Sequence, residues 1–223
     1  MSMDPEIKDL VLRSRPIVLE LLEARGYDTT PYQDQAPSAV YSLAMASLNQ
    51  PGAPPLKIRV QRKEDAPQSP YKFCEVVYLI FEKIKPTIQR RQFEEGPGRW
   101  NYIESPENTD YIFIIGEAYH ECFDSVAMQA WQKKVKISFF HIKQLIMNPT
   151  KHVLVPKHQR VAADAVADLK KELNLTSLNR LPFIKYHIDV QARWLGLTPG
   201  EVIKIIRPSV TAGETDVYRL CVP

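Results

Sequence analysis

GEVIKIIRPSVTAGETDVYRLCV, residues 200–222, is the stretch that decides the fold of the last third of this chain. Residues 201–207 are rich in Val and Ile and read as a β-strand, and residues 215–222 read as its returning hairpin partner. Residues 208–213 between them begin with proline and end with glycine, as turns do. The stretch therefore predicts a β-hairpin.

The segments before this hairpin predict a small domain of mixed secondary structure. Residues 162–173 consist mainly of Ala, Leu, Lys and Glu and predict a helix. Residues 181–184 are extended, and residues 190–195 form a short helix closed by Gly196. Residues 149–223 are therefore expected to be an α+β domain with a mixed sheet.

The first 148 residues predict an α/β layered domain. Apolar residues at helical spacing over residues 7–22 predict an amphipathic helix, which Pro16 either kinks or divides into two segments, and Arg25-Gly26 ends it. Residues 71–81 and 111–115 read as buried central strands, residues 57–62 as an edge strand, residues 123–134 as a helix and residues 135–140 as a strand.

Two stretches of this first domain are expected to be irregular. Residues 31–70 contain seven of the 18 prolines, a density that argues against any regular element there, with residues 49–55 as a loop. Residues 93–110 include Gly96-Pro97-Gly98 and Ser105-Pro106, which are also loop-forming.

Composition describes an ordinary globular chain: of 223 residues, 44% are hydrophobic and 25% are charged. The longest apolar run is six residues, too short for a membrane span, and the N-terminus has no apolar signal core. Three cysteines, Cys74, Cys122 and Cys221, give no disulfide or metal pattern and fit a reducing compartment. The net charge is −1 over residues 1–148 and +4 over residues 149–223, well short of the basic surface of an autonomous nucleic-acid binder.

No catalytic, metal-binding or cofactor-binding motif is found. The five histidines form no paired metal-ligand spacing, and no glycine-rich phosphate loop occurs. The acidic-x-Lys triplet of metal-dependent nucleases occurs only at Glu6-x-Lys8 and Asp168-x-Lys170, both within predicted helices. We therefore expect no cofactor, no metal and no catalytic residue.

Two basic clusters could meet a phosphate backbone or could simply be solvated surface. Their members are Lys83, Lys85, Arg90 and Arg91 in one cluster, and Lys133, Lys134 and Lys136 in the other.

Several motifs in the last third resemble the fifth subunit shared by eukaryotic nuclear RNA polymerases I, II and III, and also its smaller counterpart in the archaeal polymerase. They occur in the family's order over about 70 residues, which makes a chance match remote. The matching segments are His-Val-Leu-Val-Pro-Lys-His-Gln-Arg at 152–160, Leu-Pro-Phe-Ile at 181–184, Ala-Arg-Trp-Leu-Gly-Leu at 192–197, Gly-Glu-Val-Ile-Lys-Ile-Ile-Arg at 200–207, Ser-Val-Thr-Ala-Gly at 209–213 and Tyr-Arg-Leu at 218–220.

The first domain resembles the eukaryotic protein more loosely, through Leu-Leu-Glu-Ala-Arg-Gly-Tyr at 21–27. Two positions and one segment depart from the family: Val190 stands where it has proline, Val210 where it has glutamate, and Glu-Ala-Tyr-His at 117–120 where it has the segment facing downstream DNA. The two-domain layout is that of a eukaryote or of a large DNA virus that infects one.

The resemblance implies a non-catalytic subunit of a DNA-directed RNA polymerase, with a nuclease-like α/β jaw domain at 1–148 and an assembly domain at 149–223. The expected partners are the largest subunit, other subunits and, in the assembled complex, downstream duplex DNA, with no membrane. The expected location is the nucleus, or the cytoplasm or virion if the chain is viral. The alternatives are a free-standing nuclease-like enzyme and an accessory transcription regulator with a borrowed docking domain.

The same resemblance and the physical properties of the segments give two sets of expected site residues. Lys133, Lys134 and Lys136 are expected near DNA. The residues expected to bind a partner subunit are His152, Val155, Pro156, Lys157, His158, Arg160, Gly200, Arg207, Ser209, Thr211, Gly213, Tyr218 and Arg219.

Overall fold

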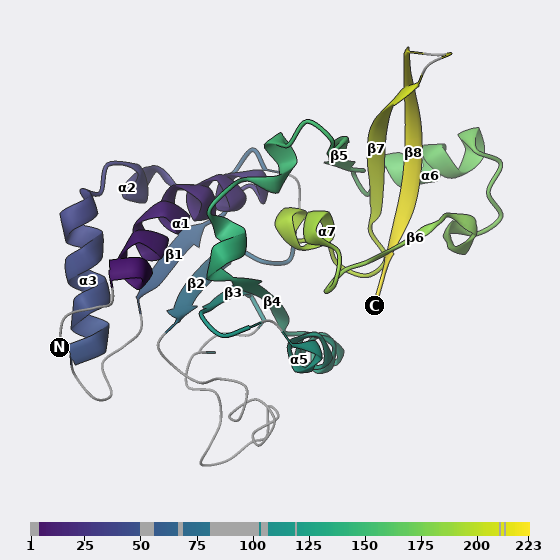
Figure 1. The fold of residues 1–223 in the computed structure, drawn as a ribbon. Coiled ribbons are helices and arrows are strands. Elements are labelled where there is room, and N and C mark those ends of the chain that lie inside the picture. The colour runs from purple at the N-terminus through teal and green to yellow at the C-terminus, as the bar shows by residue number, and fades with distance from the viewer. Residues whose placement is uncertain are drawn as a thin grey trace. The chain divides into compact units, whose positions relative to one another are not determined.

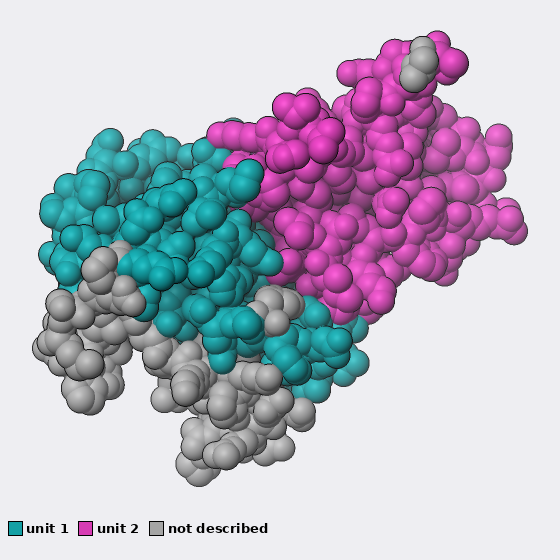
Figure 2. Space-filling model, viewed as in Figure 1, with its two compact units in different colours: residues 1–147 teal, residues 148–223 magenta. Residues whose placement is uncertain are grey.

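The computed structural model describes residues 5–49, 56–66, 69–80, 103, 107–118, 120–209, 211 and 213–223. The chain divides into two compact units, residues 1–147 and residues 148–223, which Figure 2 shows in different colours. Each unit contains its own four-stranded sheet, so the expectation of α/β architecture with a mixed sheet is confirmed. None of the described helices is both long enough and apolar enough to cross a membrane.

The sheet of the first unit has the strand order β1-β2-β3-β4 (Figure 1). Its strands are β1 (Lys57–Gln61), β2 (Phe73–Leu79), β3 (Thr109–Ile115) and β4 (Lys136–His141). β1 is an antiparallel edge strand, whereas β2, β3 and β4 run parallel. Every residue of β3 is buried, as expected of a central parallel strand covered on both faces, and the predicted central and edge strands are confirmed.

Helices cover the two faces of this sheet. α5 (Glu121–Gln132) buries Phe123 against Phe113 and Phe139, whose ring centroids lie 5.7 Å apart. α1 (Pro5–Ala24) reaches the opposite face, because its side chains and those just after it contact Tyr78 and Asp110. α1 is one continuous helix with Pro16 inside it. The expectation that Pro16 divides this stretch into two helical segments is therefore wrong. The short 3-10 helix η1 (Ile142–Leu145) follows β4 and packs on α1.

The expectation that residues 31–70 contain no helix is wrong. α2 (Thr30–Gln33) and α3 (Pro37–Asn49) lie there. Pro31 stands in the first turn of α2 and Pro37 is the first residue of α3, positions where the backbone N–H has no partner within the helix in any case. These prolines start helices instead of excluding them. Most of the loops predicted at 49–55 and 93–110 lies outside the described residues.

The second unit contains a mixed sheet with the strand order β5-β7-β8-β6. Its strands are β5 (Lys157–Arg160), β6 (Phe183–Lys185), β7 (Val202–Ser209) and β8 (Gly213–Val222). β7 and β8 form the predicted antiparallel hairpin, and β6 pairs with β8 in parallel. Pro208 lies within β7 and not in the turn as expected. β5 begins at Lys157, opposite Ile206, so β7 has no neighbouring strand on the β5 side at Pro208, and a proline is tolerated at such an edge.

One helix lies against each face of this second sheet. α6 (Ala165–Glu172) packs Leu169 on Val202 and Leu220. α7 (Val190–Leu195) buries Trp194 and ends at Gly196, whose φ of 62° is the left-handed conformation that closes a helix. Side chains alternate along a strand, so the face that carries Ile205 and Arg207 is the one opposite α6. The 3-10 helices η2 (Pro149–Lys151) and η3 (Leu178–Arg180) complete the unit.

Candidate functional site

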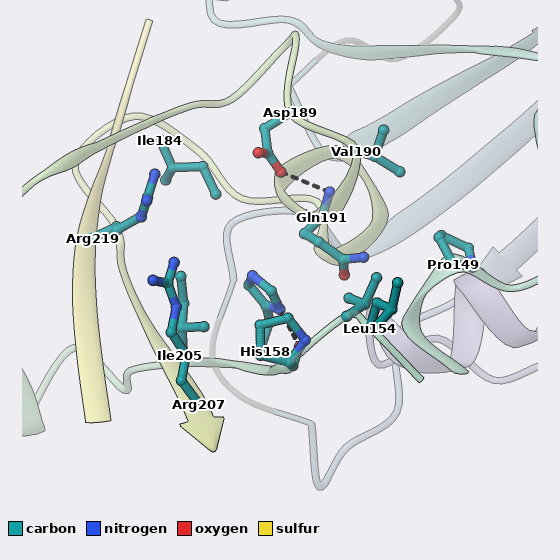
Figure 3. A pocket seen from close by; sticks show the side chains of 12 residues that line it. Pro149, Leu154, His158, Ile184, Asp189, Val190, Gln191, Ile205, Arg207 and Arg219 are labelled. Carbon is teal, nitrogen blue, oxygen red and sulfur yellow. Dashed lines mark hydrogen bonds between the residues drawn. The ribbon is translucent and has the colours of Figure 1, made fainter. Parts of the chain in front are cut away.

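A pocket of about 510 Å³ opens on the α7 side of the second sheet (Figure 3). Five of the residues expected to bind a partner line it: Val155, Pro156, His158, Arg207 and Arg219. The residues that sequence reasoning missed are Pro149, Leu154, Ile184, Asp189, Val190, Gln191 and Ile205. The pocket thus joins the segment after η2, the start of α7 and the central hairpin, which are separated along the chain.

The floor of the pocket is formed by side chains on one face of the β7–β8 hairpin. Ile205 pairs with Val217 across the two strands, Arg207 follows Ile205 by two residues, and Arg219 follows Val217 by two. Residues two apart on a strand share a face. Both arginines therefore stand on the floor face, one on each side of the Ile205–Val217 pair, and Figure 3 shows them on the same side of the pocket.

The rim is a turn that exposes apolar side chains. The amide of Val155 donates to the carbonyl of His152 at 2.9 Å, and the amide of Leu154 donates to His152 Nδ1 at 3.2 Å. This turn leaves the side chains of Val153 and Leu154 96% and 83% exposed. Pro156 then leads directly into β5.

The start of α7 forms the opposite wall. Asp189 caps the helix, with its Oδ1 accepting from the amides of Gln191 at 2.8 Å and Ala192 at 3.1 Å. This capping satisfies backbone donors that the helix cannot pair internally. The next residue, Val190, leaves 42% of its surface exposed. The carboxylate in the pocket thus has a structural role, and an apolar side chain stands beside it.

The two arginines supply positive charge that the rest of the described chain does not neutralise. Arg207 is exposed and makes no ion pair or side-chain hydrogen bond with any residue that the structure describes. Arg219 donates from Nη1 to the carbonyl of Phe183 at 3.3 Å, and its buried Nε has no hydrogen-bond partner among the described residues. Guanidinium groups in this state are suited to bind a carboxylate or phosphate from outside.

Arg160 has a role inside the fold. Its Nη2 donates to the carbonyls of Leu195 at 2.8 Å and Gly196 at 2.9 Å, and its Nε lies 3.5 Å from Glu201 Oε1. The guanidinium thereby satisfies carbonyls at the end of α7, which have no partner within the helix.

The remaining expected partner residues are dispersed over the second unit. His152 and Lys157 are exposed on the rim turn and on β5. Gly200, with φ of +97°, precedes β7, and Tyr218 packs on the α6 side of the sheet. The hairpin tip holds the other three, Ser209, Thr211 and Gly213, where the hydroxyls of the first two lie 3.3 Å apart.

The three lysines expected near DNA do not form one surface cluster. Lys133 is the C-cap of α5, and Lys134 follows it with φ of 60°. The expectation that Lys136 lies near DNA is wrong. Its side chain is only 6% exposed, and its Nζ lies 3.0 Å from Asp110 Oδ2, so it cannot reach a DNA backbone. The other basic cluster, residues 83–91, lies outside the described residues.

Asp110 is the centre of a buried polar cluster that sequence reasoning did not find. Arg25 Nη1 lies 2.8 Å from its Oδ2 and also donates from Nη2 to Ser138 Oγ at 3.2 Å. Burial alone would raise the pKa of Asp110, but the neighbouring Arg25 and Lys136 outweigh burial and hold the pKa below its ordinary value. The cluster stays ionised inside the first unit.

This cluster gives a physical role to the Arg-Gly-Tyr motif. Arg25 pairs with Asp110, Gly26 takes a φ of +85° at the end of α1, and the hydroxyl of Tyr27 donates to Asp110 Oδ2 at 3.5 Å. The motif therefore joins the first helix to the central strand. Among the described residues, no group of three or more His, Cys, Asp or Glu side chains is placed to hold a metal ion.

Known proteins resemble both the second unit and the whole chain. Residues 147–221 match the family described as RNA polymerase Rpb5, C-terminal domain. The DNA-directed RNA polymerases I, II, and III subunit rpabc1 of Dictyostelium discoideum is 28% identical over 214 residues, which cover 95% of this chain and 97% of the relative. The subunit RPABC1 of Caenorhabditis elegans is 28% identical over 214 residues and 94% of each chain. The chain is therefore similar to the Rpb5 C-terminal domain over residues 147–221 and to these RPABC1 proteins over nearly its whole length.

Proposed function

We propose that this chain is a non-catalytic subunit of a DNA-directed RNA polymerase. The observation that carries the proposal is the extent of the similarity: it covers at least 94% of both this chain and the RPABC1 relatives. An accessory regulator with a borrowed docking domain would share only the second unit with them. The full-length match therefore favours a subunit over a regulator.

The second unit is proposed to attach the chain to the largest polymerase subunit. A domain of about 75 residues buries little more than 60% of its unfolded surface and is only marginally stable by itself. Binding to a partner stabilises such a domain by mass action. The pocket face, with Leu154 and Val190 exposed beside two arginines, supports this attachment because large exposed apolar groups mark protein-binding surfaces.

The first unit is proposed to be a jaw domain that lies beside downstream duplex DNA in the assembled polymerase. Its α/β layers are the basis for describing it as nuclease-like. Lys133 and Lys134, at the end of α5, are the basic residues that we propose to lie near the DNA. The proposed location is the nucleus, or the cytoplasm or virion if the chain is viral.

The chain itself is proposed to have no enzymatic activity, because nucleotide addition in the family it resembles belongs to the two largest subunits. The isolated protein should show neither nuclease nor nucleotidyl-transfer activity with Mg²⁺ or Mn²⁺. Assays of repurified protein on duplex DNA and on a primed template check this expectation. Activity that survives repurification and is lost on replacement of a single carboxylate would favour the nuclease alternative instead.

Purification of the endogenous assembly tests the proposed function. The tagged chain should recover the two largest polymerase subunits in a one-to-one ratio with itself, as measured by quantitative mass spectrometry. Recovery with no polymerase subunit, or with substoichiometric amounts that a salt wash removes, would contradict a role as a subunit. The second result would favour the accessory regulator.

A further inference from the structure

We propose that the pocket of the second unit binds a peptide segment of a partner protein that carries an acidic residue beside a large apolar one. The carboxylate would lie between Arg207 and Arg219, and the apolar side chain would enter the hollow above Ile205. This inference rests on the proposed function, because it takes the partner to be another polymerase subunit.

The charge at the pocket favours an acidic ligand. Among the described residues no carboxylate pairs with Arg207 or Arg219, and the buried Nε of Arg219 lacks a hydrogen-bond acceptor. A buried donor without an acceptor is destabilising, so a ligand oxygen that accepts from it gains both a hydrogen bond and relief of that penalty. Guanidinium groups also bind carboxylates through two parallel hydrogen bonds.

The walls of the pocket favour an apolar neighbour to that acid. Leu154 and Val190 line the pocket while remaining 83% and 42% exposed, and Ile205 and Ile184 lie at its base. Val153 and Ile188, close to these wall residues in sequence, are exposed as well. A volume of about 510 Å³ accommodates side chains of a peptide, since ligand pockets range from about 300 to 1,000 Å³.

A peptide carboxylate fits these contacts better than a phosphate does. Asp189 also lines the pocket, and its negative charge repels a phosphate more strongly than a singly charged carboxylate. His158 is the remaining titratable group of the lining, and its Nδ1 lies 2.6 Å from the carbonyl of Pro156. Nucleic-acid surfaces need a stripe of basic groups, whereas this lining holds two arginines among apolar side chains.

Nuclear magnetic resonance of the full chain tests the ligand chemistry. The probe is N-acetyl-Leu-Asp-Phe-amide, and its control is the same tripeptide with Asn in place of Asp. The Asp peptide should shift the Arg219 Nε–H signal and the methyl signals of Ile184 and Ile205, with a dissociation constant of about 1 mM. The Asn peptide should bind at least about fivefold more weakly than the Asp peptide. Equal binding of the two peptides, or no saturable shift, would overturn the proposal.

Charge-loss variants show whether the arginines cause the selectivity. Arg207→Gln should abolish the difference between the two tripeptides, because it removes one of the two guanidinium groups between which the carboxylate would lie. The fold should remain intact, since Arg207 has no internal partner among the described residues. Arg180→Gln removes the same charge from an exposed site of the same unit outside the pocket, and should leave the difference unchanged. Identical behaviour of the two variants would contradict the assignment. A stronger shift of the Arg219 signal with inorganic phosphate than with the Asp peptide would also contradict the assignment of the pocket to a peptide carboxylate.

Cross-linking in the assembled polymerase tests the source of the ligand. With p-benzoylphenylalanine in place of Leu154, the chain should cross-link to one segment of a polymerase subunit in which Asp or Glu adjoins a large apolar residue. If the chain is recovered with the polymerase but cross-links elsewhere or not at all, the inference fails while the proposed function stands. If no polymerase subunit is recovered with the unmodified chain, the proposed function fails, and the peptide titration still reports on the pocket.

Discussion

Asp110 illustrates how a single residue connects distant parts of the first unit. Its carboxylate is fully buried, yet Arg25 approaches from the end of α1 and Lys136 from the neighbouring strand β4. Bringing charges into a protein interior is unfavourable, so such a cluster persists only while all its members are paired. The three residues lie far apart in sequence, which is why periodicity and spacing did not predict the cluster.

Asp110→Asn should lower the free energy of unfolding by about 3–5 kcal/mol, because it leaves two buried cations without a counter-charge. Urea denaturation of the full chain measures the change. Asp168→Asn is a matched control, since Asp168 pairs with Lys171 at an exposed site, and it should leave the urea midpoint unchanged. A loss of stability equal to that of the control would contradict the ionised cluster.

The same carboxylate predicts how stability depends on pH. Its pKa in the folded protein lies below the ordinary value of about 3.9, so the folded state favours the charged form. Its contribution is complete above that ordinary value, and is lost as the pH falls toward and through the lower folded pKa. Acid titrations followed by circular dichroism should therefore show a shallower loss of stability below pH 4 in Asp110→Asn than in the parent. An equal loss of stability below pH 4 in the two proteins would contradict this prediction.

Arg207→Glu reverses the charge of one of the two pocket arginines. Arg207 is exposed and has no partner among the described residues, so the fold and its melting temperature should be unchanged. Reversal of an interface arginine weakens binding by about 2 kcal/mol or more, roughly thirtyfold. Incorporation into the polymerase, measured by co-purification against an Arg180→Glu control, should be lost. Normal incorporation of the Arg207 variant would show that Arg207 does not hold the chain to the polymerase.

At the scale of elements, most of the regular structure could be predicted because it depends on local patterns. The run over residues 111–115 is apolar throughout, as a central parallel strand requires, and the hairpin consists of two runs of strand-forming residues on either side of a turn. α3 was missed because the count of prolines ignored their position: Pro37 begins the helix and breaks nothing. The pocket was found only in part, because Arg207 and Arg219 lie on the predicted hairpin whereas the position of α7 opposite them depends on tertiary packing.

The capping of α7 gives a prediction at this scale. Asp189→Ala removes an acceptor from two backbone amides and should destabilise the protein by about 0.5–2 kcal/mol. Asp164→Ala, at the start of α6, removes an exposed cap that accepts from only one amide and should have the smaller effect. Urea denaturation of both variants compares them. An equal or larger loss in Asp164→Ala would contradict the importance of the α7 cap.

At the scale of the molecule, charge limits what the isolated chain can do with DNA. Residues 1–148 carry a net charge of −1, and the burial of Lys136 reduces the described lysine cluster at the end of α5 to Lys133 and Lys134. Each phosphate contact contributes only about 0.9 to the logarithmic salt dependence of binding. Any weak contact would become effective only if the polymerase holds the proposed jaw domain beside DNA at high local concentration.

The isolated protein should therefore show no detectable binding to duplex DNA at physiological salt. In the assembled polymerase, the double variant Lys133→Glu and Lys134→Glu should reduce retention of downstream DNA, measured by footprinting over a range of salt concentrations. Lys170→Glu and Lys171→Glu on α6 make the same charge change in the other unit and serve as the control. Tight, salt-resistant binding by the free chain, or an unaltered footprint in the first variant, would remove these lysines from the DNA path.

The most direct measurement of the central claim is the intact mass of the polymerase, purified through its largest subunit from cells that express this chain. Native mass spectrometry should show an assembly that contains one copy of the 25.6 kDa chain, and gentle dissociation should release that mass and leave the remaining assembly lighter by the same amount. A complete, active polymerase without this mass, while the chain is abundant in the same cells, would contradict the assignment of the chain as a polymerase subunit.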